Sequence, residues 1–568
     1  MRYIKPLLSL IVFCAFTKVW AQLSTNEKPV SFGRESELRV SRRSANPTVT
    51  MPQLDMAKIE KEDSIDNSRN IPPRFAYPHR VNYNLNNSGT WYKLSNGDKL
   101  WQFHVSCPNA KSVHFCYDKF WIPEGGRFFV YSRDKKQTLG AYTSKNNKGD
   151  REHLRGFTTG LVYGNDVVLE YYHPKEAIND AIISIKSVLH GYNKIIGRYE
   201  VGFGKSADCM VNINCPIGNN WQSEKHAVAL MIFDDSQRYC SGALINTTKF
   251  DESPLFLTAY HCTHAAGYYT NGDSLFSNPV IDDAMFCWNY EVANCNDSIE
   301  PIPYYTHCAT VVANNYMGEF ALLQLSEDPK VYLPNFTPCY LGWDNSGQPG
   351  YPGVCIHHPL GDVKKISTVD TLISTWHRLE YENLNGDHWK VDWANGITQD
   401  GSSGSPLFNA SHKVIGLLHG GDSQCGETNP HDWFAKFSAA WNPYDIAEHQ
   451  RLDCWLDTLG STVQSLETLF VIPTTKLIDK DGQLWGIIHI KSTGQLTIQG
   501  NIEAGENGIM TVESGGKLII DGGRLSNVNL DLKPGATLRI MNGGIIETRN
   551  GFTAPIGAFV EISHGKIL

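Results

Sequence analysis

The cysteines of this 568-residue chain are concentrated in one stretch, because eleven of the fourteen lie between residues 206 and 469. Disulfides persist in exported proteins and are rare in the cytosol, so this concentration predicts a cross-linked domain built for an oxidising compartment. No two cysteines have the Cys-x-x-Cys spacing, which argues against a zinc ribbon or a thioredoxin-type motif. The chain is also too long for a single hydrophobic core, and we expect several domains.

The first residues have the three parts of a secretory signal peptide. Arg2 and Lys5 give the positive start, residues 7–16 are mostly apolar, and Val19-Trp20-Ala21 is a plausible cleavage site. The apolar run is too short to span a bilayer, and no later stretch reaches the necessary length. We therefore expect residues 1–21 to be a signal peptide and the mature protein to be secreted, in the medium or at the cell surface, without a transmembrane segment.

Composition narrows the classes of function further. The chain is 41% hydrophobic and 19% charged, which argues against global disorder. Its formal net charge is −9, so no basic face for nucleic acid is indicated, and we expect no nucleic-acid partner.

The region before the cysteine-rich stretch, residues 22–205, divides into two parts. Residues 22 to about 75 are polar and rich in Ser, Asn, Arg and Pro, which is typical of a poorly ordered leader. From about residue 75 to 175, short β-rich runs alternate with turn signals and predict a small β-sandwich. These runs are Leu100–Val105, Arg127–Tyr131 and Asp166–Tyr172. Cys107 and Cys116 lie in this part, and they either form a disulfide or remain two buried thiols.

The tail, residues 470–568, repeats a unit of Gly-x-x-apolar-x-apolar. Corresponding apolar residues, Leu496, Leu518, Leu538 and Val560, are 22, 20 and 22 residues apart. A period near twenty with strand-like alternation predicts the coils of a β-solenoid, and an antiparallel β-sandwich is the alternative. Just before the tail, residues 444–459 have helical spacing and predict a helix that closes the preceding domain. We therefore expect a chain ending near Leu469 to fold without the tail.

Two short motifs in residues 206–469 carry the chemistry. The first is Thr258-Ala259-Tyr260-His261-Cys262, and the second is Gly401-Ser402-Ser403-Gly404-Ser405-Pro406. A serine hydroxyl becomes a strong nucleophile when a neighbouring imidazole takes its proton. The tight turn around Ser403 lets the amides of Gly401 and Ser403 point at one spot, which would form an oxyanion hole.

These motifs resemble the histidine and serine motifs of chymotrypsin-fold serine proteases, and the match is closest to bacterial lysyl endopeptidases. Further matching pieces lie between residues 206 and 469: Cys209, Cys215, Gly342-Trp343-Asp344, Ile356-His357-His358-Pro359, Leu418-His419-Gly420-Gly421 and Arg451-Leu452-Asp453-Cys454-Trp455-Leu456-Asp457. The resemblance implies a mainly β chain with a chymotrypsin-like double β-barrel over residues 206–469. It also implies a serine endopeptidase (EC 3.4.21) that hydrolyses proteins or peptides after lysine, with Ser403 as nucleophile and His261 as general base.

The third catalytic residue departs from the family pattern. The family has an aspartate in an Asp-Phe-x-Leu-Leu context, and this chain has Glu319 in Glu319-Phe320-Ala321-Leu322-Leu323. Glu can orient an imidazole as Asp does, although its side chain is one methylene longer. We expect Glu319 to hold His261. The alternative is a weakly active or inactive homologue that acts as a surface binding or adhesion protein, with the tail contacting cells or glycans.

Specificity is expected to depend on Asp432. The position six residues before the nucleophile is Ile397, which cannot pair with a basic side chain. By resemblance, Asp432 lies on the opposite wall of the specificity pocket and selects lysine, because a buried carboxylate gains from an incoming ammonium. His419 and Trp376 match a histidine–tryptophan pair near the substrate. The alternatives are that Asp432 caps a turn and that Trp376 is a core residue.

The resemblance also implies three disulfides: Cys240–Cys262, Cys209–Cys425 and Cys215–Cys295. The sequence does not pair Cys287, Cys308, Cys339, Cys355 or Cys454. We expect no metal and no cofactor, since the chain has no His-Glu-x-x-His motif and no cysteine pair at zinc spacing.

Maturation is expected to remove a propeptide, residues 22–205, by a cut after Lys205, which a lysine-specific enzyme could make itself. In trypsin-like zymogens the freed N-terminal ammonium pairs with an aspartate just before the nucleophile. Here that position is Ser402, which carries no charge, so the sequence predicts no ionic partner for the new N-terminus.

Overall fold

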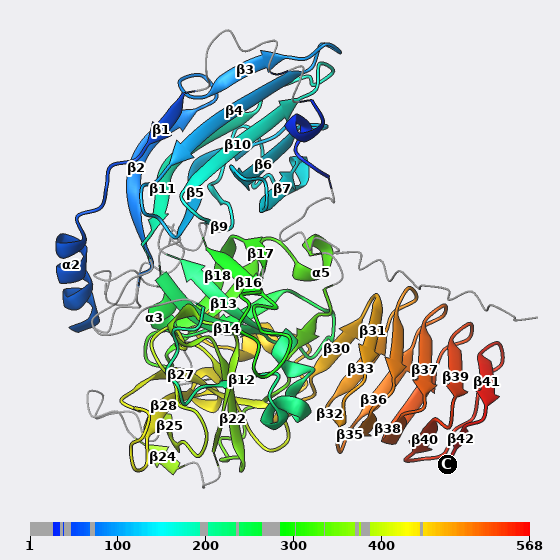
Figure 1. Cartoon of the computed structure of the whole chain (residues 1–568). Helices are drawn as coiled ribbons and strands as arrows, with labels where there is room; N and C mark the ends of the chain where they lie inside the picture. The colour runs from blue at the N-terminus through cyan, green and yellow to red at the C-terminus, as the bar shows by residue number, and fades with distance from the viewer. Residues whose placement is uncertain are drawn as a thin grey trace, which may run out of the picture.

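The computed structural model describes residues 27–34, 38, 47–68, 74–192, 203–233, 238–263, 284–301, 303–333, 336–369, 374–376, 387–442 and 447–568. The predicted signal peptide lies outside the described residues. A β-sandwich, two curled half-barrels and a solenoid follow one another along the chain (Figure 1). The expectation of a mainly β chain with a double barrel is confirmed. Within the described part, no helix combines the length and the apolar character needed to cross a bilayer.

The N-terminal domain is a sandwich of two sheets. One has the order β1 (Thr48–Thr50), β4 (Lys99–Ser106), β10 (Asp166–His173), β6 (Arg127–Ser132), β7 (Thr138–Tyr142), with β3 (Thr90–Lys93) on β4. The other has the order β2 (Ala76–Asn84), β11 (Ile182–Gly191), β5 (Ser112–Trp121), β8 (Phe157–Thr158), with β9 (Val162–Tyr163) on β5. The three predicted β runs are therefore β4, β6 and β10. Cys107 and Cys116 are both buried and form no disulfide, so the alternative of two buried thiols holds.

Part of the leader expected to be poorly ordered has regular structure. It forms a 3-10 turn, η1 (Val30–Gly33), the strand β1 and the helix α2 (Met56–Ser68). Arg74 forms ion pairs with Asp63 and Glu62 of α2, and the Tyr192 hydroxyl donates to Asp63 at 2.9 Å. These buried charge-assisted contacts hold α2 on the protein in a way that the polar composition of the segment did not indicate.

The first half-barrel is a sheet with the order β17 (Tyr304–His307), β16 (Met285–Trp288), β13 (Val228–Phe233), β14 (Arg238–Leu244), β15 (Leu255–Thr258), β19 (Phe320–Leu325), β18 (Ala309–Asn315). The second has the order β12 (Val211–Asn212), β23 (Lys365–Val369), β22 (Gly353–His357), β26 (Pro406–Phe408), β27 (Val414–Gly421), β28 (His431–Lys436), β25 (His388–Asp392), β24 (Ser374–Trp376), with β21 (Trp343–Asp344) and β29 (Ser465–Leu466) at the side. Short helices connect these strands: η3 (Pro216–Trp221), η4 (Glu224–His226), α3 (Tyr260–Thr263), α5 (Pro329–Tyr332), η5 (Pro359–Gly361) and α6 (Phe437–Trp441); a further 3-10 turn, η2 (Ser144–Asn146), follows β7 in the sandwich.

The predicted closing helix over residues 444–459 is wrong. Where the structure describes this segment, it contains a 3-10 turn, η6 (Glu448–Gln450), and a single helical turn, α7 (Asp453–Leu456). Arg451 separates them in an extended conformation, with φ −144° and ψ 150°. Its guanidinium binds the Asp453 carboxylate at 2.6 and 2.8 Å, and that carboxylate also accepts the Cys454 amide at 2.8 Å, a side-chain-to-backbone bond of the kind that competes with a continuous helix.

The tail is a β-solenoid, as its period predicted. Three parallel sheets run along it: β30 (Leu469–Ile472), β33 (Ile487–Ile490), β36 (Ile509–Val512) and β38 (Arg524–Leu532); β31 (Thr475–Ile478), β34 (Gln495–Ile498), β37 (Lys517–Asp521), β39 (Thr537–Met541) and β41 (Phe559–Ser563); and β32 (Gly482–Leu484), β35 (Asn501–Ala504), β40 (Ile545–Thr548) and β42 (Lys566–Ile567), which join through β38. The register aligns Leu496 with Leu518, Leu518 with Leu538, and Leu538 with Val560. The repeating apolar residues therefore stack in successive coils.

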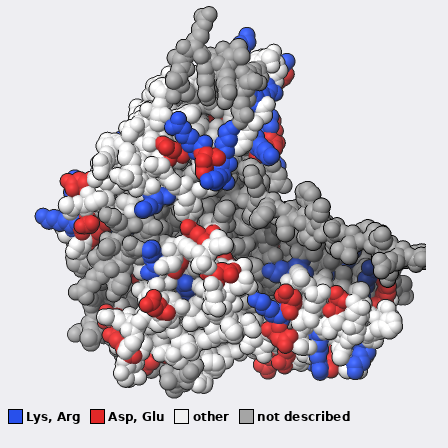
Figure 2. Space-filling view, viewed as in Figure 1, with Lys and Arg blue, Asp and Glu red and all other residues white. Residues whose placement is uncertain are grey.

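The solenoid shares a hydrophobic core with the barrels. Strand β30 pairs with β20 (Cys339–Tyr340), so the boundary expected after Leu469 falls inside a strand. His412 of the second half-barrel is stacked between Trp221, at a ring-centroid distance of 3.7 Å, and Trp485 of the solenoid, at 4.5 Å. On the face shown in Figure 2, basic and acidic side chains are interspersed over the sandwich and the solenoid.

Candidate active site

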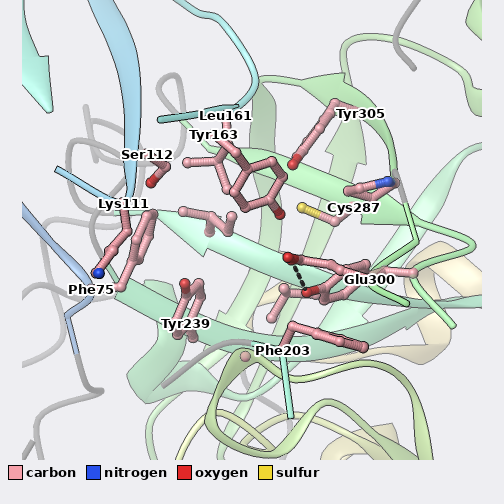
Figure 3. A pocket seen from close by; sticks show the side chains of 15 residues that line it. Phe75, Lys111, Ser112, Leu161, Tyr163, Phe203, Tyr239, Cys287, Glu300 and Tyr305 are labelled. Carbon is pink, nitrogen blue, oxygen red and sulfur yellow. Dashed lines mark hydrogen bonds between the residues drawn. The ribbon is translucent and has the colours of Figure 1, made fainter. Parts of the chain in front are cut away.

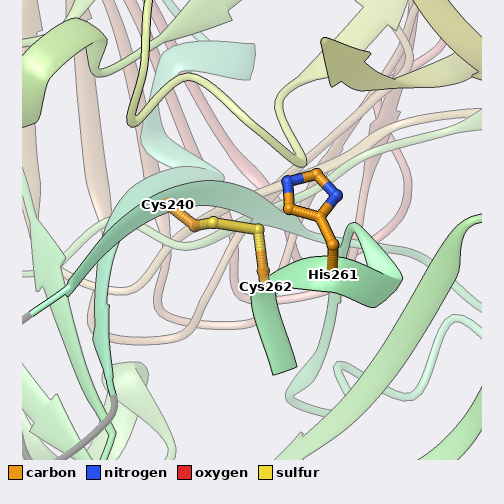
Figure 4. A group of neighbouring side chains, drawn as sticks. All are labelled: Cys240, His261 and Cys262. Carbon is orange, nitrogen blue, oxygen red and sulfur yellow. A yellow bond between two sulfur atoms is a disulfide. The ribbon is translucent and has the colours of Figure 1, made fainter. Parts of the chain in front are cut away.

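His261 is presented by the one-turn helix α3, which follows strand β15 directly. The neighbouring Cys262 forms a disulfide with Cys240 of β14, and Figure 4 shows the His261 ring projecting beside this bridge. The bridge ties the helix to the adjacent strand, so the backbone that carries the imidazole is held in place.

Glu319 contacts His261 where the family resemblance places an aspartate. Strand β19 pairs with β15 so that Ala321 lies opposite Thr258, which brings the preceding turn to α3. The Glu319 Oε1 atom is 2.5 Å from His261 Nδ1 and accepts the His261 backbone amide at 3.2 Å. Glu319 is in the left-handed region, with φ +49°, a conformation that the surrounding contacts must hold.

Glu319 is only 2% exposed, and it is shared by two histidines. Its Oε2 atom lies 3.6 Å from His419 Nε2, and the His419 ring is stacked near His261 with a centroid distance of 5.8 Å. Burial by itself would raise the pKa of Glu319, but the nearby His419 and His261 and the hydrogen bonds from His261 lower it to about 2. The carboxylate therefore stays ionised and favours a positive charge on either ring.

Two further groups extend this network behind His419. The His419 Nδ1 atom is 2.9 Å from Nε2 of the buried His388 on β25. Asp387 lies behind His388, with 2.9 Å between its Oδ1 and His388 Nδ1, although the two atoms are not aligned for a hydrogen bond. Trp376 lies on β24 directly opposite His388 in the strand register, which brings its backbone to the same region of the sheet.

Ser403 lies in a tight turn that packs on the histidine motif. Its carbonyl accepts the Ser241 amide at 2.8 Å and is 3.7 Å from Cys262 Sγ. Gly404 has φ +81°, and a Cβ there would lie 2.2 Å from Thr258 Oγ1, so a glycine is required. In the described part of the chain, Ser403 Oγ and His261 form no direct hydrogen bond. Such contacts are often loose before a substrate binds.

The turn of residues 399–404, which we name the oxyanion turn after its predicted role, has two backbone amides without an acceptor among the described residues. The amide of Ser402 donates to Gln399 O at 2.9 Å and that of Gly404 donates to Leu418 O at 2.8 Å. Among the described residues, the amides of Gly401 and Ser403 form no hydrogen bond. Gly401 has φ +87°, which glycine adopts at little cost. The arrangement can therefore offer two donors to a developing oxyanion.

Ser402, which has no charge to offer a new N-terminus, contacts a buried histidine. Its Oγ atom is 2.8 Å from His357 Nδ1, and the other ring nitrogen of His357 is 3.0 Å from Ser367 Oγ. Burial, together with the nearby Lys365, lowers the pKa of His357 to about 3. His357 is therefore a neutral histidine that holds the turn.

Asp432 on β28 is 1% exposed and is surrounded by neutral donors. Its Oδ2 atom accepts from Trp393 Nε1 at 2.6 Å, and also from the side chains of Thr398 and Ser423 at 2.6 and 2.8 Å. Its Oδ1 atom accepts only from the Ser423 amide, at 3.3 Å. In the described part of the chain, Asp432 has no cationic partner. Burial raises its pKa against these hydrogen bonds.

Asp432 lies close to the catalytic turn. Thr398, which binds it, is five residues before Ser403, and Gly421 lies opposite Asp432 on β27, two residues after His419. A Cβ at Gly421 would be 1.7 Å from Asp432 Oδ1, so only glycine fits beside that oxygen.

The three disulfides of the structure join the pairs that the resemblance implies: Cys209–Cys425, Cys215–Cys295 and Cys240–Cys262. The cysteines that the sequence did not pair form no disulfide in the described part of the chain: Cys287, Cys308, Cys339, Cys355 and Cys454. Among the residues that the structure describes, two groups have ligand atoms close enough for a metal ion. One is Cys240, His261 and Cys262, where the sulfurs form a disulfide, and the other is His261, Glu319 and His419.

Sequence reasoning missed the residues that support the site from a distance. They are Asp387 and His388 behind His419, Trp393, Thr398 and Ser423 around Asp432, and Asp362 beside the oxyanion turn. The one available signal was that Asp362 follows the matching piece His357-His358-Pro359 by three residues.

Residues 203–435 match the family model described as lysyl endopeptidase, C-terminal domain. A lysyl endopeptidase of Pseudomonas aeruginosa is 27% identical over 312 residues, which are 51% of this chain and 62% of that protein. The HtrA-type protease AlgW with tripeptide is 17% identical, with a TM-score of 0.26 over 38% of this chain and 58% of that one. The active form of the Rv3671c protease from M. tuberculosis is 14% identical, with a TM-score of 0.24 over 38% and 78%. Residues 203–435 are therefore similar in sequence to lysyl endopeptidases, and the chain spans less than two thirds of the length of the curated relative that it matches.

Proposed function

We propose that the protein is a secreted serine endopeptidase that cleaves proteins or peptides on the carboxyl side of lysine. The catalytic residues are Ser403, His261 and Glu319, the oxyanion donors are the amides of Gly401 and Ser403, and Asp432 receives the lysine. Three disulfides support an oxidising location, since such bonds persist outside the cytosol.

Acylation begins when Ser403 Oγ attacks the carbonyl carbon of the scissile bond and passes its proton to His261 Nε2. Glu319 holds the Nδ1 proton of His261, which fixes the tautomer and stabilises the imidazolium that forms. The negative charge on the carbonyl oxygen is met by the two free amides. The imidazolium then protonates the leaving amine, the C–N bond breaks, and an ester to Ser403 remains.

Deacylation repeats these steps with water. His261 Nε2 takes a proton from water as the water oxygen attacks the ester carbonyl. The oxyanion again accepts hydrogen bonds from the two amides. Collapse of the intermediate breaks the bond to Ser403 Oγ, which regains its proton from His261. The peptide leaves with a new carboxylate, and the enzyme is unchanged.

The observation that carries the lysine preference is the uneven environment of Asp432. Oδ2 is occupied by neutral donors, whereas Oδ1 has one long hydrogen bond and faces a glycine. A buried carboxylate without a cation is costly, and an ammonium that reaches Oδ1 supplies the missing charge. His419 and Trp376 are proposed to line the substrate side of this pocket.

The alternative of an inactive binding protein was motivated by Glu319. The 2.5 Å contact between Glu319 and His261 argues against it, because the longer side chain reaches the imidazole. That the tail contacts a cell surface or glycans stays a prediction, which binding of the full chain to glycan arrays or cells would test.

Mass spectrometry of the peptides released from a mixed protein substrate tests the proposed function. We expect new C-termini at lysine, and we expect a fluorophosphonate probe to label Ser403 and not the Ser403→Ala variant. Release of peptides by the purified Ser403→Ala variant at the wild-type rate would refute the site.

A further inference from the structure

We propose that Asp362 pairs with the α-ammonium of Ser206 after the chain is cut behind Lys205, and that this ion pair positions the oxyanion turn. The inference rests on the proposed function, since a lysine-specific enzyme can make that cut itself. It assigns Asp362 as a positioning residue. It differs from the expectation drawn from Ser402 that the new N-terminus has no ionic partner, because the proposed acid comes from a different loop than the residue before the nucleophile.

Asp362 already binds the residues on both sides of the predicted cut. Its Oδ2 atom accepts the Ser206 amide at 3.3 Å and the Ser206 hydroxyl at 2.5 Å. Its Oδ1 atom accepts the Gly204 amide at 2.8 Å and the Val363 amide at 2.7 Å. The side chain of Asp362 is fully buried, and its one cationic neighbour in the described part of the chain is Lys365, at 3.4 Å. That ammonium is shared, because it also donates to Asn212 Oδ1 at 2.6 Å.

The segment to be cut is exposed at Gly204 and Lys205 and is anchored just before them by Phe203. Gly204 and Lys205 are exposed, so a protease can reach the bond after Lys205. Phe203 lines a cavity of about 250 Å³ between the sandwich and the first half-barrel, shown in Figure 3. The same cavity is lined by Tyr163 of the sandwich and by Gly361, the residue before Asp362. The uncut linker therefore runs from the junction of the two domains directly onto the Asp362 loop.

The Asp362 loop packs against the oxyanion turn. The Leu360 amide donates to Asp400 O at 2.6 Å. A Cβ at Gly401 would lie 3.1 Å from His358 O and 3.2 Å from the amides of Leu360 and Gly361, so the two loops are in close contact. A shift of residues 358–362 would therefore move the backbone that carries one oxyanion donor.

The new N-terminal segment also reaches the turn directly. The Ala207 amide donates to Gln399 Oε1 at 2.9 Å, and Gln399 O accepts the Ser402 amide at 2.9 Å. Residues 206 and 207 thus contact both the carboxylate and the residue that fixes Ser402. Anchoring Ser206 more firmly would hold this chain of contacts in place.

Cleavage changes the charge at this point. Hydrolysis consumes one water, gives Lys205 a free carboxylate and turns the Ser206 amide into an ammonium. The segment that ends at Lys205 can then move away. The Gly204 donor is lost with the propeptide, and the contact between the Ser206 nitrogen and the Asp362 carboxylate becomes an ion pair, while the Ser206 hydroxyl keeps its hydrogen bond. We take the added attraction between the two charges, set against their desolvation, as about a tenfold change in an equilibrium.

Two variants of the full chain test the proposal. Asp362→Asn removes the charge of the acceptor. Insertion of one alanine between Lys205 and Ser206 moves the ammonium by about 3.8 Å, one residue, and leaves a neutral amide at Ser206. N-termini are verified by mass spectrometry. We expect each variant to lose about tenfold in kcat on a lysine peptide, with KM changed less than about threefold, and the double variant to be no slower than either single one. Asp208→Asn, which removes an exposed carboxylate two residues after Ser206, should keep the wild-type kcat.

The outcomes separate this inference from the proposed function. If the wild-type protein does not cleave after lysine, the proposed function fails. If it does, and the alanine insertion with a verified N-terminus keeps the wild-type kcat, the ion pair is refuted. Strictly additive losses in the double variant would also refute it, because the two changes would then act independently. Should Asp362→Asn fail to fold, the insertion variant decides alone, since it keeps every side chain.

Discussion

Replacing Asp432 with asparagine tests the lysine pocket through two properties that should change in opposite directions. The substitution keeps the shape of the side chain and removes its charge. The donors from Trp393, Thr398 and Ser423 to Oδ2 can be kept by the amide oxygen, whereas the amide nitrogen would replace Oδ1, the oxygen proposed to meet the lysine ammonium.

The expected loss of activity follows from breaking a buried ion pair. Removing one partner of such a pair costs about 3–5 kcal/mol. At about 1.4 kcal/mol for each factor of ten, kcat/KM on lysine substrates should fall about 150- to 5,000-fold. Activity on peptides with a neutral residue at that position should change much less, because they do not use the charge.

Stability should not fall with the activity. Burial raises the pKa of Asp432, so the folded protein disfavours the charged form. A group of this kind makes the fold less stable as pH rises from its unfolded pKa through its raised folded pKa. At neutral pH the charge is therefore a net cost, and the melting temperature of Asp432→Asn should equal or exceed that of the wild type, with a smaller difference in acid.

Peptide kinetics and thermal melts at pH 8 and pH 4 measure both properties. Asp422→Asn, which removes an exposed carboxylate beside Gly421, is the matched control and should behave as the wild type. Unchanged cleavage after lysine by Asp432→Asn would refute the pocket. A melting temperature several degrees lower at pH 8 would refute the argument that the carboxylate lacks a partner.

Three more results are expected. Glu319→Gln should lower kcat by up to about 10⁴-fold without changing which bonds are cut, as peptide mapping would verify, because the imidazole loses the group that fixes its tautomer; a variant as fast as the wild type would assign this task to another residue. The pKa of Glu319 falls from 4.5 to about 2, so its contribution to stability is present above pH 4.5 and is lost as pH falls toward 2. The free energies of unfolding of the wild type and Glu319→Gln should therefore converge in that pH range. A constant difference between them would contradict this assignment. A chain ending at Leu469 should give little soluble protein in an expression assay, because the truncation removes Phe470, Val471 and Ile472, each at most 1% exposed, and uncovers β20. Abundant soluble, active protein would instead support the prediction from the sequence that the barrels fold without the tail.

The sequence was most informative where structure is encoded by neighbouring residues. The solenoid register follows from a short period, so Leu496, Leu518 and Leu538 could be aligned before any coordinates. The turn around Ser403 could be predicted in the same way, because its glycines are needed within a few residues of one another. The family resemblance supplied the disulfide pairs.

The groups that the sequence did not reveal act across long separations. Asp362 binds Ser206 from 156 residues away, and His388 meets His419 from 31 residues away on another strand. Such contacts depend on how the sheets close, which no local pattern records. The predicted helix over residues 444–459 failed for the opposite reason, since its apolar spacing was overridden by one extended residue, Arg451.

Joining the solenoid to the barrels through β20 and β30 makes the tail a rigid spacer. Parallel strands stack about 4.8 Å apart, and each coil contacts only the coils beside it. The distance between the catalytic barrels and the last coil is therefore set in steps of one coil of about twenty residues. Removing or duplicating a whole coil would change the distance between the last coil and the barrels without altering the residues around Ser403.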